Sequence, residues 1–376
     1  MSFIDEDDDP FEEQRENAEN PMKRLFLEYG SDNRRAFVVG VLASVVARVL
    51  DLIPPVVLGV AVDAVFTGNA DAYSIPLVPQ SVIPETQTAQ FWFSIGLIAF
   101  GFFGGAAFHW TRNWGWNSFA QNIQHSIRTD TYDKMQRLNM DFFADKQTGE
   151  MMSILSNDVN RLERFLNDGM NSAFRLSVMV LAIAAILVYY NWQLALVALV
   201  PVPLIAAFTY KFVKTIQPKY ADVRSSVGKV NSRLENNLGG IQVIKTSNTE
   251  GYESDRVDDV SQGYFDANWD AIATRIKFFP SLRVLAGVGF VTTFLVGGLW
   301  VFSGPPGPFT GTLSAGEFVT FIVLTQRFIW PMAQFGQIIN MYQRARASSS
   351  RIFGLMDEPS RIVEDPDADE LVVEDG

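Results

Sequence analysis

The chain has 376 residues, of which 48% are apolar and only 19% are charged, whereas a typical soluble domain is about 25% charged. It contains no cysteine, which excludes disulfides, zinc–thiolate sites and thiol catalysis. The net charge of −12 resides in the two ends: residues 1–20 and 357–376 carry −8 each, which leaves +4 for residues 21–356. We expect residues 1–19 to form a disordered acidic tail, and a mildly positive body suits contact with anionic lipid head groups.

Residues 20–32 are expected to form a short interfacial elbow helix. Asn20 can cap it, Pro21 suits its first position, and Gly30 can end it. Apolar residues recur at i, i+3, i+4 and i+7, so that one stripe can lie on the membrane. The alternative is a leader helix without membrane contact. The stripe consists of Met22, Leu25, Phe26 and Tyr29.

Six apolar blocks follow, each of about 20 residues or more, which is the length that crosses a bilayer as a helix. The connections 67–90, 189–193 and 303–313 contain no Lys or Arg, while the connections on the other side are rich in both. Basic residues stay mostly on the cytoplasmic side, so both termini are expected in the cytoplasm. The sequence predicts an all-α membrane protein of the cell membrane, with six transmembrane helices in residues 33–356. The blocks are 36–66, 91–115, 171–190, 192–214, 279–303 and 313–340.

Two long cytoplasmic segments, residues 116–170 and 215–278, are polar but keep apolar residues at helical spacing. We interpret each as a helical hairpin that continues the membrane helices into the cytoplasm. At 1.5 Å per residue, 25 helical residues would project about 35–40 Å. The tips of both hairpins carry helix-start signals: Thr148 is a plausible cap, and Ser247 with Glu250 has the spacing of a capping box. Two hairpins on one side of a membrane favour a docking surface for a cytoplasmic partner, although they can also be structural arms without one.

Several short motifs in these segments resemble one family. Residues 142–159 read F-F-x4-T-G-E-M-x-S-x-L-x-N-D-V, which is similar to the first intracellular loop of the membrane domains of ATP-binding-cassette (ABC) exporters. Residues 239–245, G-G-I-Q-V-I-K, followed by Glu250, are similar to the second intracellular loop. Pro54-Pro55 with Val62-Asp63 and the run 351–359, R-I-F-G-L-M-D-E-P, also resemble the family. The resemblance covers about residues 20–360.

The resemblance implies a dimer of six-helix units, formed with a second copy or a homologous half-transporter. Helices two to six would contribute to a central cavity, and short coupling helices would sit in grooves of the ATPase domains. ATP binding would close those domains and turn the cavity outward. Coupling helix one would fall at about Thr148–Ile154, and coupling helix two would cross to the neighbouring subunit's ATPase domain. The implied coupling residues are Thr148, Gly149, Glu150, Met151 and Met152, and Ser247, Asn248, Thr249, Glu250, Gly251 and Tyr252.

The sequence departs from a complete exporter because it contains no G-x4-G-K-[S/T] phosphate loop. No ATPase residue, catalytic residue or cofactor is therefore expected in this chain. ATP and magnesium are expected in an associated nucleotide-binding domain. The run 351–359, which in the family leads into the ATPase domain, favours one polypeptide over a separate ATPase chain, and residues 357–376 are expected to form an acidic linker toward that domain. Leu313–Glu317 resembles the nucleotide-contacting signature, but it lies at the outer start of the sixth span, and we reject it.

Ionisable residues inside a bilayer cost at least about 2.5–3.5 kcal/mol each at a helix centre, so they usually face a cavity or a partner. Arg48 and Asp51 lie one helical turn apart and can pair with each other. Polar residues of the sixth span can line a cavity or hydrogen-bond between helices, and Pro331 is an expected bend. The candidate substrate pathway consists of Arg48, Asp51, Arg283, Gln326, Arg327, Gln337 and Asn340.

Two other functions stay open at this point. A six-helix sensor or scaffold without ATP coupling would use the hairpins to relay a signal. A secondary transporter would need an ion site near the midplane, for which the Arg48–Asp51 pair is the candidate. His109 and His125 are the only histidines, so a metal site is not expected, and basic residues do not cluster enough to bind nucleic acid. No motif in the sequence names the solute.

Overall fold

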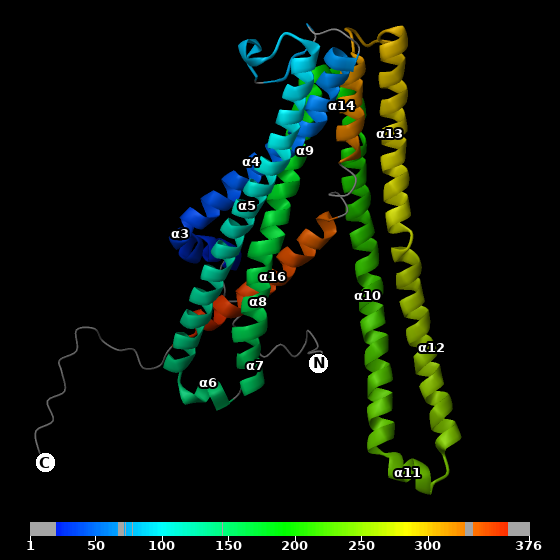
Figure 1. The fold of residues 1–376 in the computed structure, drawn as a ribbon. Coiled ribbons are helices and arrows are strands. Elements are labelled where there is room, and N and C mark those ends of the chain that lie inside the picture. The colour runs from blue at the N-terminus through cyan, green and yellow to red at the C-terminus, as the bar shows by residue number, and fades with distance from the viewer. Residues whose placement is uncertain are drawn as a thin grey trace, which may run out of the picture. The chain divides into compact units, whose positions relative to one another are not determined.

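The computed structural model describes residues 20–66, 71, 73–76, 78–144, 146–327 and 334–359. The expected N-terminal tail and most of the C-terminal linker lie outside these residues. Within them every regular element is a helix, which confirms the all-α fold (Figure 1). The chain divides into two compact units. Unit 1 contains residues 1–51, 99–179 and 337–376, and unit 2 contains residues 52–98 and 180–336.

The helices follow one another along the chain with few breaks. The elements labelled η are single turns of π-helix, except η5, which is a 3₁₀ turn. Their bounds are α2 Pro21–Arg24, η2 Leu25–Tyr29, α3 Gly30–Asp32, α4 Arg34–Ala61, η3 Val62–Phe66, η5 Gln80–Val82, α5 Gln87–Arg137, α6 Met140–Ala144, α7 Thr148–Ser153, η6 Ile154–Asp158, α8 Val159–Arg164, η7 Phe165–Gly169, α9 Met170–Leu199, α10 Pro201–Gly239, α11 Ile241–Thr246, α12 Glu250–Arg275, α13 Phe278–Ser303, α14 Ala315–Gln326 and α16 Phe335–Asp357.

Four helical runs among the described residues are long and apolar enough to cross a membrane: 34–66, 87–137, 148–239 and 250–303. The third run contains two of the six predicted spans. They meet at Asn191, whose backbone is non-helical (φ −156°, ψ 101°) and which lies at the predicted outer turn. The sixth predicted span begins as the shorter α14, and the expected bend at Pro331 lies outside the described residues. The continuous α5, of 51 residues and about 75 Å, reflects the absence of proline from residues 85–200.

The elbow helix differs from the expectation at both ends. Asn20 has a left-handed backbone (φ 46°) and no capping hydrogen bond from its side chain, because a capping residue needs an extended backbone. The prediction of an Asn20 cap is therefore wrong, whereas Pro21 does occupy the first helical position. Gly30 is right-handed (φ −70°), and helix continues to Asp32. The apolar stripe packs into the core of unit 1, with Leu25 fully buried, so this face contacts protein rather than lipid.

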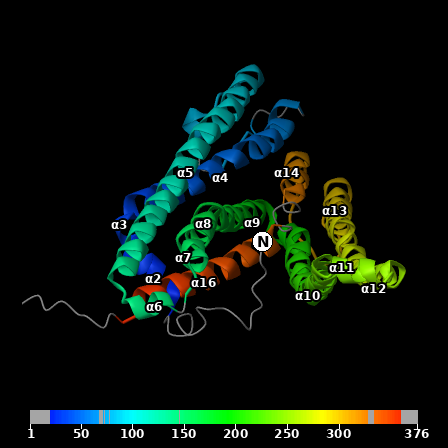
Figure 2. The same ribbon diagram turned by 90° about the horizontal axis from the view of Figure 1, so that it is seen from below.

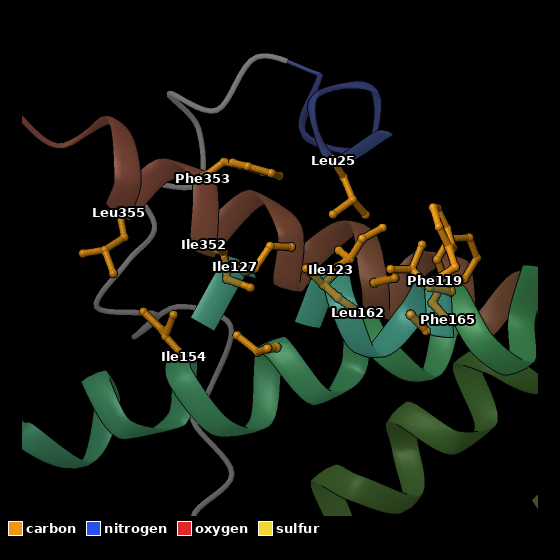
Figure 3. Close-up of a cluster of buried hydrophobic side chains, with 14 of the residues drawn as sticks. Leu25, Phe119, Ile123, Ile127, Ile154, Leu162, Phe165, Ile352, Phe353 and Leu355 are labelled. Carbon is orange, nitrogen blue, oxygen red and sulfur yellow. The ribbon is translucent and has the colours of Figure 1, made fainter. Parts of the chain in front are cut away.

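The core of unit 1 lies in the predicted first cytoplasmic hairpin. Side chains of α5 and of the run from η6 to η7 meet those of the elbow helix and α16 (Figure 3). Its largest members are fully buried and recur at the helical spacing that the sequence displays. They include Phe119, Ile123, Ile127, Ile154, Leu162, Leu166 and Phe353.

Within unit 1, α4 and α5 approach each other closely at two glycines. A Cβ on Gly115 would lie 2.6 Å from the backbone nitrogen of Gly40, so neither helix could keep its position with a larger residue there. One turn further along α4, the Ser44 hydroxyl accepts a hydrogen bond from the buried Trp116 indole at 3.2 Å. This hydrogen bond links the two helices next to their close approach.

In unit 2, α10 and α12 lie side by side and form the predicted second hairpin. The short α11 crosses their ends, as the view from below shows (Figure 2). Lys219 on α10 and Asp270 on α12 form an ion pair at 2.6 Å. A separate small core of unit 2 joins η3 to the segment before α5, where the Tyr73 and Ser94 hydroxyls are 2.7 Å apart.

Candidate functional site

The tip of the first hairpin carries the predicted coupling helix one, and α7 begins at Thr148 as expected. Thr148 is not the cap, however. Gln147 has the extended backbone of a capping residue (φ −79°, ψ 142°), and its N–H donates to the Glu150 carboxylate at 3.0 Å. Glu150 thus neutralises the positive end of the helix. The exposed face of α7 includes Met152, which is 57% exposed, while Met151 is buried.

The tip of the second hairpin lacks the expected capping box of Ser247 and Glu250, because the residue before α12 is Thr249. The short helix at this tip is α11, Ile241–Thr246, and Ser247 follows it rather than capping a new one. Asn248 is left-handed (φ 51°), and the Thr249 N–H donates to the Ile244 carbonyl at 3.1 Å, which closes the end of α11. A new helix, α12, begins at Glu250, whose carboxylate is 3.1 Å from Lys245. Its own backbone N–H and then Lys245 lower the pKa of Glu250.

Asp158 joins the first hairpin to α16. This carboxylate is only 2% exposed, and it accepts two hydrogen bonds from the Arg351 guanidinium, at 2.6 and 2.9 Å. The Ser348 hydroxyl donates to it at 2.8 Å, and Arg161 lies 3.3 Å away. Bidentate pairing of this kind fixes both distance and orientation. Asp158 and Arg351 stand in the two motifs that resemble the first intracellular loop and the lead-in to the ATPase domain.

A line of polar contacts also joins α5 to the returning half of this hairpin. Asn160 accepts from Gln124 at 2.8 Å and from Arg128 at 3.1 Å, and Arg128 donates also to the Leu155 carbonyl at 3.2 Å. These side chains hold the register of the two helices along the hairpin. Burial, and next the charge of Asp168, raise the pKa of Glu163, which accepts from Gln121 at 3.2 Å.

The elbow helix is tied to the last turn of α16. Arg24 donates twice to Asp357, at 2.6 and 2.7 Å, and its guanidinium lies 4.7 Å from the centre of the Phe353 ring. Burial alone would lower the pKa of Arg24, but hydrogen bonds to Asp357 and Glu28 outweigh it and raise the pKa. Burial, and then Asp130, raise the pKa of Tyr29. The contacts of Arg24 with Asp357 and Phe353 hold the elbow helix at the end of α16.

The predicted pair in the first span forms as expected. Arg48 and Asp51 are 3.1 Å apart, and His109 of α5 shares Asp51 at the same distance. The side chains are 16%, 29% and 29% exposed, so all three are largely enclosed by helices. The contacts among these three side chains do not test whether Arg48 and Asp51 line a substrate pathway.

The other residues of the candidate pathway are divided between the two units, and the pathway stays a prediction. Arg283 is exposed on α13, and Gln326 and Arg327 are exposed at the end of α14. Gln337 and Asn340 are exposed on α16, which belongs to the other unit. The expected common face of Gln326, Gln337 and Asn340 required one unbroken helix over residues 313–340. In the structure α14 ends at Gln326, and residues 328–333 lie outside the described part.

The rejected nucleotide signature has a clear structural role. Ser314 caps α14 and accepts from the Glu317 N–H at 3.0 Å. Asp63 accepts hydrogen bonds from the Ser314 hydroxyl and from the Gly316 N–H, the latter at 2.7 Å. Gly316 and Gly59 lie so close that a Cβ on Gly316 would overlap the Gly59 carbonyl. In the part of the chain described, no three His, Asp or Glu side chains gather in a way that could hold a metal ion.

Comparison with known proteins identifies the family of this chain. The sequence profile of the ABC transporter transmembrane region matches residues 37–332. The chain belongs to this family.

Relatives in this family are ATP-binding proteins of greater length. An uncharacterized ABC transporter ATP-binding protein, YknU of Bacillus subtilis, is 25% identical over 92% of this chain and 55% of its own length. A fatty acid ABC transporter ATP-binding/permease protein of Mycobacterium bovis is 28% identical over 65% of this chain and 37% of its own length. An ATP-dependent lipid A-core flippase of Syntrophus aciditrophicus is 23% identical over 67% and 41%. The chain spans about half the length of the first of these relatives.

Asp158, Arg351 and Asp63 lie within motifs of this ABC transporter region, but the sequence did not indicate that they belong to a site. Nor did it indicate His109 as the partner of Asp51. The sequence contains one signal for the first contact: Asp158 and Arg351 lie in two motifs that resemble the same family. Nothing in a single sequence indicates that residues 193 positions apart form a hydrogen bond.

Proposed function

We propose that this chain is the translocation domain of an ATP-driven ABC exporter and that it passes the movement of ATPase domains to a membrane pathway. The observation that carries the proposal is the buried Asp158–Arg351 contact. It joins the first hairpin to α16, the helix that leads toward the end of the chain. The transporter would work as a dimer in the cell membrane, with the termini of this chain in the cytoplasm.

Force can pass through this contact because each partner lies on a long helical element. Asp158 stands within the helical run that begins with α7 at the hairpin tip, and Arg351 stands on α16. Around them, the cluster of buried apolar side chains fills the space between the same elements. Packed cores of this density change position as units rather than deforming continuously. A push on α7 would thus move α16 with it.

The exposed tips support the second half of the proposal. Met152 on the first tip and Val243 on α11 are 57% and 66% exposed, and exposed apolar side chains at the end of a stiff arm suit a docking surface. The partner would be an ATPase domain, in the same polypeptide or a separate one, with ATP and magnesium bound there. The expected coupling residues 148–152 and 247–252 remain part of this proposal, with α11 added.

We infer the chemical class of the transported solute from the names of two relatives. Relatives carry the names of a fatty acid transporter and a lipid A-core flippase. An outward-moving amphipathic or lipid-like solute is accordingly the cargo we propose. A sensor or scaffold without ATP coupling gains no support from any contact described above.

The test replaces Asp158 with Asn in the transporter together with its ATPase domain, reconstituted in liposomes. Transport per ATP hydrolysed should fall about tenfold or more, equivalent to about 1.4 kcal/mol, while binding of a fluorescent ATP analogue should be retained. Asp270→Asn removes an equally charged group from an exposed pair of the second hairpin and should leave both quantities unchanged.

A second variant, Arg351→Lys, keeps the charge but loses the bidentate geometry. It should show a smaller loss in the same direction. Wild-type transport by folded Asp158→Asn protein would contradict the proposal. So would ATP hydrolysis without any dependence of solute movement on ATP.

A further inference from the structure

A cavity of about 270 Å³ lies within unit 2, where four segments of the chain meet. They are the end of α4 with η3, the stretch before η5, the part of α9 before Asn191, and the start of α14. Drug-sized ligands occupy pockets of about 300–1,000 Å³, so this cavity suits a smaller molecule. The connections next to it, 67–90 and 189–193, are those predicted to face the outer side of the membrane.

Two carboxylates line the cavity, and both are bound to the start of α14. Asp63 accepts hydrogen bonds from the Ser314 hydroxyl and from the Gly316 N–H, as described above. Glu317 accepts from the Ser314 N–H through Oε2, at 2.9 Å. Its other oxygen, Oε1, accepts no hydrogen bond from the residues that the structure describes, and it is not buried. Oε1 of Glu317 is therefore available to a ligand.

The lining of the cavity contains no positive charge to match these two carboxylates. Every lining residue belongs to residues 52–98, 180–210 or 284–326, and these three stretches contain no Lys, Arg or His. A cation that enters the cavity is consequently attracted by both carboxylates, and a cation with an N–H group can also donate a charge-assisted hydrogen bond to Glu317.

Two adjacent tyrosines at the end of the third predicted span add features that suit an organic cation. The Tyr190 hydroxyl oxygen is buried and has no hydrogen-bond partner among the described residues, which is costly for a polar group. The Tyr189 side chain is 69% exposed. The two rings pack edge to face, with centroids 5.7 Å apart. Because the faces of aromatic rings attract organic cations, an ammonium ion would satisfy the hydroxyl and gain from the rings.

We propose that this cavity binds a primary alkylammonium ion from the predicted outer side of the membrane. The N–H groups of the ion donate to Glu317 Oε1 and to the Tyr190 hydroxyl, and its alkyl group lies toward Tyr189. A metal ion suits the cavity less well, because only two of its lining residues are carboxylates and none is a histidine. A neutral sugar would leave the negative charge unmatched.

The site goes beyond the proposed function and does not depend on it, because binding here requires no ATPase domain. Isothermal titration calorimetry tests it on the transporter together with its ATPase domain, without nucleotide, in a neutral detergent. Butylammonium chloride replaces sodium chloride at constant ionic strength and should bind once per chain. Tetramethylammonium chloride, which has no N–H group, should bind about tenfold more weakly. Calcium chloride, 1-butanol and glucose, titrated in parallel, should bind at least about tenfold more weakly as well.

Glu317→Gln removes the charge but can still accept from the Ser314 N–H, as glutamine does in a capping box. It should weaken butylammonium binding about tenfold or more. Tyr190→Phe keeps the ring and should weaken binding about three- to tenfold without lowering thermal stability, because the hydroxyl has no partner to lose. Glu85→Gln, at an exposed position of the predicted outer connection, removes the same charge and should leave binding unchanged.

A folded Glu317→Gln variant with the affinity of the wild type would overturn the proposal. If that variant does not fold, Tyr190→Phe decides, and an unchanged affinity there has the same consequence. Binding of calcium, 1-butanol or glucose as tight as that of butylammonium would assign the cavity to another class of ligand and also overturn it. Failure of this site leaves the coupling experiment on Asp158 unaffected, and the reverse holds, so the two proposals can be separated.

Discussion

The two long helical hairpins, residues 116–170 (the first arm) and 215–278 (the second arm), have the same helical architecture but differ in what covers their apolar side chains. On the first arm, Phe119, Ile123 and Leu162 are no more than 1% exposed, because the elbow helix and α16 pack against them. On the second arm, Leu238, Val243 and Tyr252 are 70%, 66% and 64% exposed. The first arm is therefore held by its own chain, while the second presents an apolar surface that a partner can cover.

This difference bears on how each arm could work in an ABC transporter. A packed arm can transmit force within its own chain, as the Asp158 contact suggests. An exposed arm suits contact with another molecule, which agrees with the implied crossing of the second hairpin to the neighbouring subunit. Because the two arms differ in burial, substitutions at matched positions should have different effects on stability.

The largest expected effect comes from Phe119→Ala on the first arm. Removal of a fully buried phenylalanine should lower the free energy of unfolding by about 3–5 kcal/mol. Leu238→Ala, at an exposed position of the second arm, should change it by about 0.5 kcal/mol or less. Thermal or denaturant unfolding of the two variants in one detergent gives both values. Similar losses from both variants would show that the second arm is covered as well.

Substitution of two glycines should change the free energy of unfolding by smaller amounts, and the two changes should have opposite signs. Gly115→Ala places a methyl group against the α4 backbone at 2.6 Å and should destabilise by about 1–3 kcal/mol. Gly228→Ala, in the second arm, meets nothing within 4 Å and should stabilise its helix by about 0.5–1 kcal/mol. Melting temperatures that shift in the same direction would argue against the close α4–α5 crossing.

The smallest effect concerns the elbow helix. Asp357→Asn removes the carboxylate whose two oxygens accept from Arg24 Nη1, but the two side chains are 29% and 42% exposed. Solvent screens such a pair, so the loss should be about 1 kcal/mol or less. It should shrink further at high ionic strength. An effect independent of salt would mean that the contact stabilises by packing on Phe353 and not by charge.

The sequence predicted the architecture where local chemistry decides it. Apolar blocks predicted the long apolar helices, the absence of proline matched the unbroken α5, and the motif at the first tip located the start of α7. Caps were predicted less well. Asn20 and Ser247 are residue types that favour caps. The left-handed backbone of Asn20 leaves its side chain without a capping hydrogen bond, although the helix begins at Pro21 as predicted. At the second tip, Ser247 follows α11 and Asn248 is left-handed, so that α12 begins only at Glu250.

Contacts between distant segments could not be predicted in this way. The pairing of Asp158 with Arg351, of Asp63 with Gly316, and of His109 with Asp51 depends on how long helices pack, and one sequence carries no record of it. The Arg48–Asp51 pair was predictable because both residues lie on one helix, three positions apart. The prediction of a common face for Gln326, Gln337 and Asn340 depended on a continuous sixth helix.

The central claim is that the first arm and α16 move as one body. Because the chain has no cysteine, spin labels at Gly149→Cys on α7 and Gln343→Cys on α16 can report their separation in the transporter with its ATPase domain. The account predicts the same distance distribution without nucleotide and with ATP trapped, and a changed distribution in the Asp158→Asn variant. A wild-type distribution that shifts when ATP binds would contradict it.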